Sequence, residues 1–447
     1  MKKLSWVMLV LVFSLVVSAC GSNSTNNGSN AKNDSTPTNN QGDQNAAQSG
    51  SDNEEVKITI LNSKSEIHTQ MTEAGQQFSS AFPHIEVEVI STTQDQSPVE
   101  RASSLYASGN PATITMLDTG DIEKFADKAL DLSNEQWVSE QAQQFLIDGK
   151  TISFPFAVEG YGLIYNKEVL DNVSGGSFDP ATINTTAKLE KLFQSIEQAG
   201  IVPLYIGSMD WSLGNHFLAI SYATQGDTDV KGFIEVLKQG NADLINNSSF
   251  NGLLDTFDVM KNYNGGKADP MAVIYEQSTA AVAKGEAAMT FNGNWLITEL
   301  LKSNPEGEYG FIPVPISNNE GDHANSSVAV GATKQFFVDA EKSTPAQQEA
   351  AKQFLNWLVY EAEGQDFLVN KANVIPAFKN IELELNNSLA IAINEYNLAG
   401  KSIEFAGNFV PGDHWKVLGA SMQKYLADRA DRSALATEIE EYWKSIQ

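Results

Sequence analysis

Residues 152–170 read ISFPFAVEGYGLIYNKEVL, and this stretch is the one that decides the fold. Gly160 and Gly162 give its backbone a freedom that other residues lack, so we expect the chain to bend here. Glu159 stands directly before the first glycine, where its carboxylate could accept hydrogen bonds from hydroxyl groups. The role of the stretch depends on the sequence on either side of it.

The sequence before this stretch alternates between strand and helix patterns. Residues Val56–Leu61 (VKITIL) and Ile85–Ile90 (IEVEVI) alternate polar and apolar side chains, as strands do. Between them, Glu66–Phe82 carries apolar residues at helical spacing. Strand, helix and strand with short joins indicate a βαβ unit of a parallel sheet. We expect another helix at Val99–Ser108 and a third strand at Ala112–Leu117.

The same alternation continues after the stretch. The expected helices are Ala187–Ala199, Lys231–Gln239, Phe250–Asn262, Ser278–Lys284, Ala346–Val369, Trp415–Asp428 and Ala434–Ile446. The expected strands are Val202–Ile206, Ala288–Phe291, Tyr309–Ile312 and Gln335–Val338. The fold class is therefore α/β, and at this length the alternation implies two domains rather than one.

Several motifs, in order along the chain, carry a family resemblance. Ile152–Leu170 matches a pattern of proline, then glycine and LIYNK, and Lys284–Leu296 (KGEAAMTFNGNWL) matches K-G-x-A-A-M-x-x-x-G-x-W. Tyr309–Pro315 (YGFIPVP), Val328–Phe337 (VAVGATKQFF) and the segment AAKQFLNWLVYEAEGQDF follow in the same register. Together they resemble the carbohydrate-binding solute-binding proteins of bacterial ABC importers, the maltose-binding-protein-like extracellular solute-binding protein family 1.

The resemblance implies a periplasmic-binding-protein-like fold. In this fold two α/β lobes are joined by a three-crossing hinge, and the ligand cleft lies between the lobes. The expected crossings are near Leu163–Asn166, Asn325–Ala329 and Val374–Ala377. Lobe one then comprises residues 54–164 plus 328–375, and lobe two comprises 165–327 plus 376–447.

The N-terminal segment has the parts of a secretory signal peptide. Two lysines precede an apolar run from Leu4 to Val17, which is shorter than the ~20 residues that span a membrane. The segment Leu15–Cys20 (LVVSAC) resembles the lipobox of bacterial lipoproteins, in which the cysteine is lipidated and becomes the first mature residue. The alternative is an ordinary signal peptide with a chance cysteine. We expect a signal peptide over 1–19 and a lipid on Cys20.

Residues 20–53 follow as a tether. Ser, Asn, Gly, Gln and Thr fill most of this segment, which has almost no large apolar side chains. Such a composition cannot bury enough surface to offset the entropy of ordering, so we expect a disordered linker with a reach of about 30 Å. The expected location is the outer face of the cell membrane, through the lipid anchor only.

Charge and cysteine content exclude several classes of function. The formal charge of −27, or −29 without the two lysines of the signal peptide, opposes binding to nucleic acid and to anionic lipid. With Cys20 as the only cysteine, the protein has no disulfide and no cysteine-based metal site. The five histidines show no metal-ligand spacing, so we expect no metal and no cofactor.

A neutral sugar needs flat aromatic rings for its faces and polar groups for its hydroxyls. Trp295 matches the G-x-W motif, in which the family stacks the ring on sugar. Trp211 and Trp415 lie in or beside loops with polar neighbours, and Tyr161 is either a sugar stacker or a hinge-packing ring. Packing in the core is the alternative for Trp295, whereas Trp415 could instead start the last helical region, with Asp413 as its N-cap. Trp357 and Trp443 fall on apolar helix faces and are expected in the core.

The polar candidates follow strands or flank these rings. Asp118 ends a strand, where the family often places a sugar-binding aspartate, although Asp118 or Asp121 could instead cap the next helix. The other candidates are Glu159, Glu66, Asp210 beside Trp211, and Asn292 and Asn294 beside Trp295. Asn-Gly is also an ordinary turn signal. His216 and His414 are weaker candidates, next to aromatic residues in loops.

The resemblance implies capture of a sugar, more an oligosaccharide than a monosaccharide, by closure of the cleft and delivery to the permease subunits of an ABC importer. The sequence shows no nucleophile elbow, HExxH, Walker A or dinucleotide fingerprint, so we expect no enzyme activity. The alternatives are a lipoprotein glycosidase and a non-catalytic adhesion protein. We expect a monomer.

Overall fold

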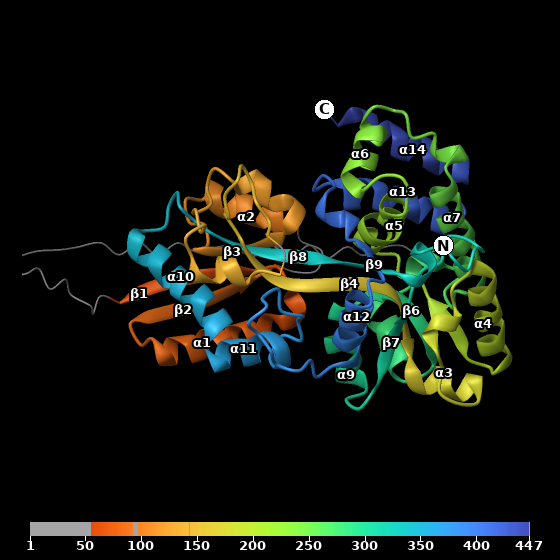
Figure 1. Ribbon diagram of the computed structural model, residues 1–447, viewed down its shortest axis with the longest axis horizontal. Coiled ribbons are helices and arrows are strands. Elements are labelled where there is room, and N and C mark those ends of the chain that lie inside the picture. Colours follow the sequence, from red (N-terminus) through yellow and green to blue (C-terminus); the bar gives the residue numbers. More distant parts are fainter. Residues whose placement is uncertain (1–54, 93–96, 143, 447) are drawn as a thin grey trace, which may run out of the picture. The chain divides into compact units, whose positions relative to one another are not determined.

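The computed structural model describes residues 55–92, 97–142 and 144–446, so the predicted signal peptide, Cys20 and the linker lie outside the described residues. Nine strands of the described residues form one sheet with the order β2-β1-β3-β8-β4-β6-β5, in which β7 also pairs with β4 and β9 with β8 (Figure 1). The strands are β1 (Val56–Asn62), β2 (Ile85–Ser91), β3 (Ile114–Asp118), β4 (Phe154–Asn166), β5 (Val202–Tyr205), β6 (Ala287–Gly293), β7 (Tyr309–Ile312), β8 (Val328–Val338) and β9 (Ser402–Glu404).

The predicted βαβ unit at the start of the ordered chain is confirmed. Strands β1 and β2 pair in parallel along their whole length, and α1 (His68–Ala81) connects them. Alternate residues of β1, Ile58 and Ile60, are fully buried, as the sequence alternation predicted. Gly75 lets α1 approach the sheet, because a Cβ there would lie 2.9 Å from Val87 Cγ1.

The remaining helices cover both faces of the sheet. Figure 1 shows α1, α10 and α11 on one face of the β1–β2–β3 region and α2 on the other. The helices after α1 are α2 (Pro98–Ala107), α3 (Lys167–Ser174), α4 (Thr186–Gln198), α5 (Ala219–Ala223), α6 (Val230–Lys238), α7 (Ser248–Tyr263), α8 (Tyr275–Ala283), α9 (Ile297–Ser303), α10 (Pro345–Tyr360), α11 (Ala362–Asp366), α12 (Ser388–Leu398), α13 (His414–Leu426) and α14 (Arg432–Ser445). None of these helices is long and apolar enough to cross a bilayer.

The decisive stretch forms β4, the longest strand. Residues 154–161 of β4 pair antiparallel with β8, and residues 161–166 pair with β6 and β7. Nearly every side chain of β4 is buried, so the strand lacks the alternation of a half-exposed strand, and its period could not be recognised in the sequence. The boundaries of the predicted lobes and hinge crossings stay predictions.

The two glycines of this strand are explained by close packing rather than by a bend. Neither Gly160 nor Gly162 has a positive φ. A Cβ on Gly160 would lie 2.6 Å from Ile393 Cδ1 and 2.8 Å from Ala329 O, and one on Gly162 would lie 3.0 Å from Ile312 O. The interpretation as a source of backbone freedom was therefore wrong: these positions need the absence of a side chain.

Two features of the helices differ from the sequence expectation. The single helix predicted over 346–369 is divided at Glu361, whose backbone is extended at φ −96° and ψ 144°, and it continues as α11 and a π-helical turn at Phe367–Lys371. The sequence also missed α3, α5, α9 and α12. All four are short, at 5 to 11 residues, and isolated helices of this length are marginal in water, so tertiary packing decides their conformation.

Both tryptophans that were predicted for the core are there. Trp357 is 3% exposed and Trp443 is fully buried. His414, a candidate for contact with a ligand, also lies in the core, fully buried at the start of α13. Tyr222 Oη donates to His414 Nε2 at 3.2 Å, and His414 Nδ1 donates to Asn215 Oδ1 at 3.0 Å. The candidacy of His414 was therefore wrong, because both ring nitrogens are used within the protein.

A Gly160→Ala substitution should destabilise the protein by about 1–3 kcal/mol, because the new methyl group overlaps Ile393 and a strand carbonyl. Urea denaturation would measure the change. Gly176→Ala is the matched control, since a Cβ at Gly176 meets nothing within 4 Å and its φ is not positive. Equal stabilities of the two variants would contradict the packing explanation.

His414 should make the stability depend on pH. Burial lowers the pKa of His414 to about 3, whereas an unfolded histidine has a pKa of about 6.5. The unfolded chain therefore binds the extra proton, so this contribution is complete above about pH 6.5 and is lost as the pH falls toward about 3. Urea denaturation measures the free energy of unfolding at each pH between 7 and 5. The wild-type value should fall with decreasing pH more steeply than that of His414→Gln, by up to about 1.4 kcal/mol per pH unit. Equal slopes would contradict it.

Candidate functional site

A buried ion pair joins the loop after β1 to the middle of β4. Lys64 and Glu159 are each 4% exposed, and Lys64 Nζ donates to Glu159 Oε1 at 2.6 Å. The same ammonium group lies 2.7 Å from Glu66 Oε1, and Thr333 Oγ1 donates to Glu159 Oε2. Buried charges are tolerated only with such partners, so these groups form one connected network.

Electrostatics keep both partners of this pair charged. Burial alone would raise the pKa of Glu159, but the ammonium groups of Lys64 and Lys334 outweigh it and hold the pKa below its ordinary value. Burial alone would lower the pKa of Lys64, but Glu159 and Glu66 outweigh it and raise the pKa. The network therefore offers charged groups of both signs at neutral pH.

A second ion pair continues this network on the neighbouring strands. Asp118 and Lys334 face each other in the β3–β8 register, with Lys334 Nζ 2.5 Å from Asp118 Oδ1. The Asp118 side chain is 49% exposed, so its carboxylate is accessible to a ligand. Asp118 occupies the N-cap position of the 3₁₀ helix Thr119–Phe125 but makes no side-chain capping bond. The capping alternative is thus not supported for Asp118.

Asp121 lies in that same 3₁₀ helix and is more buried than Asp118. Burial, and next the charge of Asp118, raise the pKa of Asp121, although Lys124 Nζ donates to its Oδ1 at 2.8 Å. Both groups approach Gly412 so closely that a Cβ at Gly412 would overlap them. This places residues 121–124 directly against the segment before α13.

A cluster of aromatic rings forms the other half of the site. It contains Trp211, Trp295, His216, Tyr161 and Tyr275. The Trp295 centroid lies 5.1 Å from His216 and 6.4 Å from Trp211, and the Trp211 centroid lies 6.2 Å from Tyr275. Tyr161 stacks on His216 at 4.9 Å with an interplanar angle of 27°. Trp211 and Trp295 are only partly buried, so part of each indole is open to a ligand.

Local structure explains how these rings come together. Trp295 lies in the 3₁₀ turn Asn294–Leu296 directly after β6, and its ring covers Gly293 so closely that a Cβ there would overlap it. Trp211 and His216 lie on the π-helical segment around Ser212–Leu218, where the sequence predicts a loop. Asp210 precedes this segment and accepts a hydrogen bond from Trp211 N at 2.8 Å.

Asn292 and Asn294, both predicted to bind the ligand, instead hydrogen-bond to the backbone and are buried. Asn294 Oδ1 accepts from Gly160 N at 2.9 Å, which fixes the turn of Trp295 to β4. Asn292 Oδ1 accepts from Gly293 N at 2.9 Å. Both side chains are almost fully buried, at 2% and 3% exposure. Their amide groups therefore position the aromatic turn.

Nine of the ten predicted site residues fall into three sets. Asp118, Glu159 and Glu66 belong to the ion network, and Trp295, Trp211 and Tyr161 belong to the aromatic cluster. Asn292, Asn294 and Asp210 hold the turns on which the indoles lie. Trp415 stands apart at the start of α13, and within the described part of the chain no ring contact joins it to the cluster.

Sequence reasoning missed Lys64, Lys334 and Thr333, and it gave His216 little weight. The two lysines were overlooked because lysine is almost always exposed unless it is paired. A usable signal was the position of Lys64, two residues after the end of β1 and two residues before Glu66. Tyr275 was missed because it begins α8, whereas the sequence predicts the start of this helix three residues later, at Ser278.

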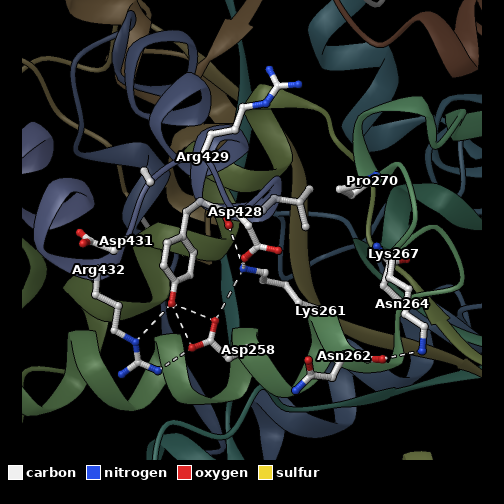
Figure 2. Close-up of a pocket in the computed structure, with 13 residues that line it drawn as sticks. Asp258, Lys261, Asn262, Asn264, Lys267, Pro270, Asp428, Arg429, Asp431 and Arg432 are labelled. Atoms are coloured by element: carbon white, nitrogen blue, oxygen red, sulfur yellow. Dashed lines mark hydrogen bonds and ion pairs between the residues drawn. The ribbon is translucent and has the colours of Figure 1, made fainter.

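A small cavity of about 10 Å³ lies between the two halves of the site, where Lys64, Glu159 and Asn294 meet Trp295. This volume holds about one water molecule, so no sugar ring fits without movement. A much larger cavity of about 940 Å³ lies elsewhere, between α7 and the α13–α14 turn (Figure 2). Its aromatic residue, Tyr425, is covered by Lys261 Nζ at 4.6 Å from the ring centroid, so it offers no free stacking face.

Most charged side chains of this larger cavity also form ion pairs with one another. Figure 2 shows Arg432 joined to Asp258 and Lys261 joined to Asp428, at 2.8 Å and 2.6 Å. The smaller site combines exposed indole surface with charged groups, so we take it as the functional site despite its size.

Comparisons with known proteins identify the family and the fold of the chain. The family model described as bacterial extracellular solute-binding protein matches residues 73–390. The melibiose/raffinose/stachyose-binding protein MelE of Bacillus subtilis is 23% identical over 290 residues, which is 63% of each chain. The chain spans less than two thirds of the curated relatives it matches, 38% of one and 63% of MelE.

Solved structures show the same fold at low sequence identity. The solute-binding protein RafE in complex with raffinose has a TM-score of 0.73 and 19% identity, with coverage of 87% of this chain and 99% of RafE. A sugar transporter protein of Bacillus licheniformis in complex with stachyose has a TM-score of 0.69 and 17% identity, with coverage of 88% and 100%. The predicted periplasmic-binding-protein-like fold is therefore confirmed, and the chain belongs to the family of bacterial extracellular solute-binding proteins.

Proposed function

We propose that this protein captures an oligosaccharide between its aromatic cluster and its ion network and delivers it to the permease of an ABC importer. The observation that carries the proposal is the position of the partly open indole of Trp295, which lines one cavity with the charged groups of Lys64 and Glu159 and has Trp211 beside it. Indole faces pack against the C–H-rich faces of sugar rings, and charged groups form hydrogen bonds with the hydroxyls.

The names of similar proteins support the choice of ligand. MelE is described as binding melibiose, raffinose and stachyose, and the two structural neighbours hold raffinose and stachyose. All of these are short oligosaccharides without ionised groups. The paired charges of the site suit such a ligand, because neither ion pair offers an unneutralised cation to an acidic sugar.

Capture by closure explains why the cavity is so small. Lys64 and Glu66 lie before α1, whereas Trp295 follows β6, and the two halves meet without room for a sugar, so we take the described conformation as a closed form that must open to admit a ligand. The predicted lobes and hinge provide that movement. A ligand that binds both lobes stabilises the closed form by its difference in affinity. A micromolar dissociation constant corresponds to about −8 kcal/mol, within reach of a few stacked rings and hydrogen bonds.

The charge state of Glu159 favours binding over glycoside hydrolysis. A glycosidase needs a general acid whose pKa is raised. The pKa of Glu159 is instead held low by Lys64 and Lys334, and both of its oxygens accept hydrogen bonds within the protein. We therefore propose a non-catalytic, monomeric receptor that leaves ATP hydrolysis to other subunits.

The proposed location is the outer face of the cell membrane. It rests on the lipobox-like segment Leu15–Cys20, with residues 20–53 as the tether to the folded part. A receptor held within tens of ångströms of its permease meets it repeatedly.

Trp295→Ala should weaken oligosaccharide binding more than ~10-fold, because it removes one stacking face while the partly buried ring contributes less to the core. A thermal-shift screen over mono- and oligosaccharides first identifies the ligand, and calorimetric titration then measures both affinities. Tyr360→Ala, which removes a partly buried ring from the end of α10, is the control and should bind normally. Intact affinity with a large loss of thermal stability would place Trp295 in the core instead.

Cys20→Ser should release the protein from cells into the medium, because serine cannot carry the thioether-linked lipid. Immunoblots of membrane and medium fractions would measure the distribution, with Ser22→Ala as the control that stays with the membrane. Retention of the Cys20 variant would contradict the proposed anchor.

A further inference from the structure

His216 lies at the centre of the aromatic cluster. Its ring stacks on Tyr161 with the centroids 4.9 Å apart and is tilted against Trp295 at 5.1 Å, and the centroids of Trp211 and Phe405 lie 5.4 Å away at steep interplanar angles. The side chain is only partly buried. Four rings therefore fix the imidazole plane while one part of the residue remains accessible.

The two ring nitrogens of His216 have different surroundings. Nδ1 is sealed from solvent and has no hydrogen-bond partner, whereas Nε2 is not sealed. Across residues 55–92, 97–142 and 144–446, no group hydrogen-bonds to either nitrogen. The imidazole thus has one unused polar atom that is sealed within the protein and one that is not.

The imidazole is neutral at physiological pH. Burial lowers the pKa of His216 to about 4, against the opposing charges of Glu159 on β4 and Asp118 on β3, and Lys334 on β8 lowers it further. A neutral imidazole carries one N–H. A buried N–H without an acceptor is rarer and more costly than a buried lone pair. The proton therefore belongs on Nε2, with the lone pair of Nδ1 facing the interior.

We infer that His216 is a specificity-determining residue whose Nε2–H donates to an oxygen of the sugar unit that lies on Trp211 and Trp295. This inference rests on the proposed function and deepens it. The donor is single, and the four surrounding rings fix its direction. A sugar unit with a hydroxyl or ring oxygen at that edge satisfies it, whereas a deoxy analogue leaves it unpaired and is disfavoured.

The competing explanation is that His216 only packs against its neighbouring rings. Two substitutions distinguish this explanation from donation of a hydrogen bond to the sugar. His216→Phe keeps an aromatic ring in the cluster but removes the N–H. His216→Gln loses the ring but places an amide N–H close to the position of Nε2. Donation predicts that glutamine preserves affinity better than phenylalanine, and packing predicts the reverse.

The experiment titrates the full chain with the oligosaccharide that the wild-type protein binds, and with its deoxy analogues. His216→Phe should bind the sugar ~10-fold more weakly, as expected for the loss of one hydrogen bond, and should no longer distinguish the deoxy analogue at one position. His216→Gln should recover most of the affinity. His323→Phe is the control, because His323 is elsewhere, bonded to Gly400 O at 3.1 Å.

Nitrogen NMR of the imidazole gives a second readout that needs no variant. The ligand-free protein should show the Nε2–H tautomer, and sugar should shift Nε2 more than Nδ1. An Nδ1–H tautomer, or unchanged affinity in His216→Phe, would overturn the inference while leaving sugar capture intact. A wild-type protein that binds no sugar would overturn the proposed function and the inference with it.

Discussion

The buried pair of Lys64 and Glu159 is the constraint on which the site depends. Each ion taken out of water costs several kcal/mol, which only close and complete pairing can offset. Lys64 meets this condition with two carboxylates, and Glu159 meets it with Lys64 and Thr333. The pairing joins the loop after β1 to β4 and β8. Separating these segments would leave buried charges without partners, so the polar half of the site is held together.

The aromatic half depends on the same strand. Asn294 accepts from the backbone of Gly160, the residue next to Glu159, and thereby fixes the turn that carries Trp295. Tyr161, the following residue, stacks on His216. Three consecutive residues of β4 thus support the site: Glu159 belongs to the ion network, Gly160 holds the turn of Trp295, and Tyr161 stacks on the imidazole of His216. Movement at this point of β4 would change both halves of the site at once, as closure around a ligand requires.

The sequence predicted the parts of the fold that have a local pattern. Strand β1 alternates polar and apolar residues over most of its length, so its position could be predicted from its period. Strand β4 is buried on both faces and does not alternate, so it was recognised only through its family motif. The conformation of the 212–218 segment, and with it the place of His216, depends on contacts with α13 and β4 that no local pattern reveals.

The candidate site shows the same division between local and long-range information. Trp295 and Glu159 stand in motifs and could be named from the sequence, and the structure places both in the two halves of one site. The pairing of Lys64 and Lys334 with their carboxylates joins residues up to 216 positions apart, so neither lysine could be given a partner in advance. The sequence also gave the wrong reason for Gly160, because a close contact with Ile393 leaves no trace near residue 160.

Small-angle X-ray scattering of the protein with and without its oligosaccharide tests the central claim of capture by closure most directly. If the sugar lies between the ion network and the aromatic cluster, saturating ligand should reduce the radius of gyration, and the reduction should follow the binding isotherm. An unchanged radius of gyration at full saturation would contradict the account, because the sugar would then be bound without bringing the two halves together.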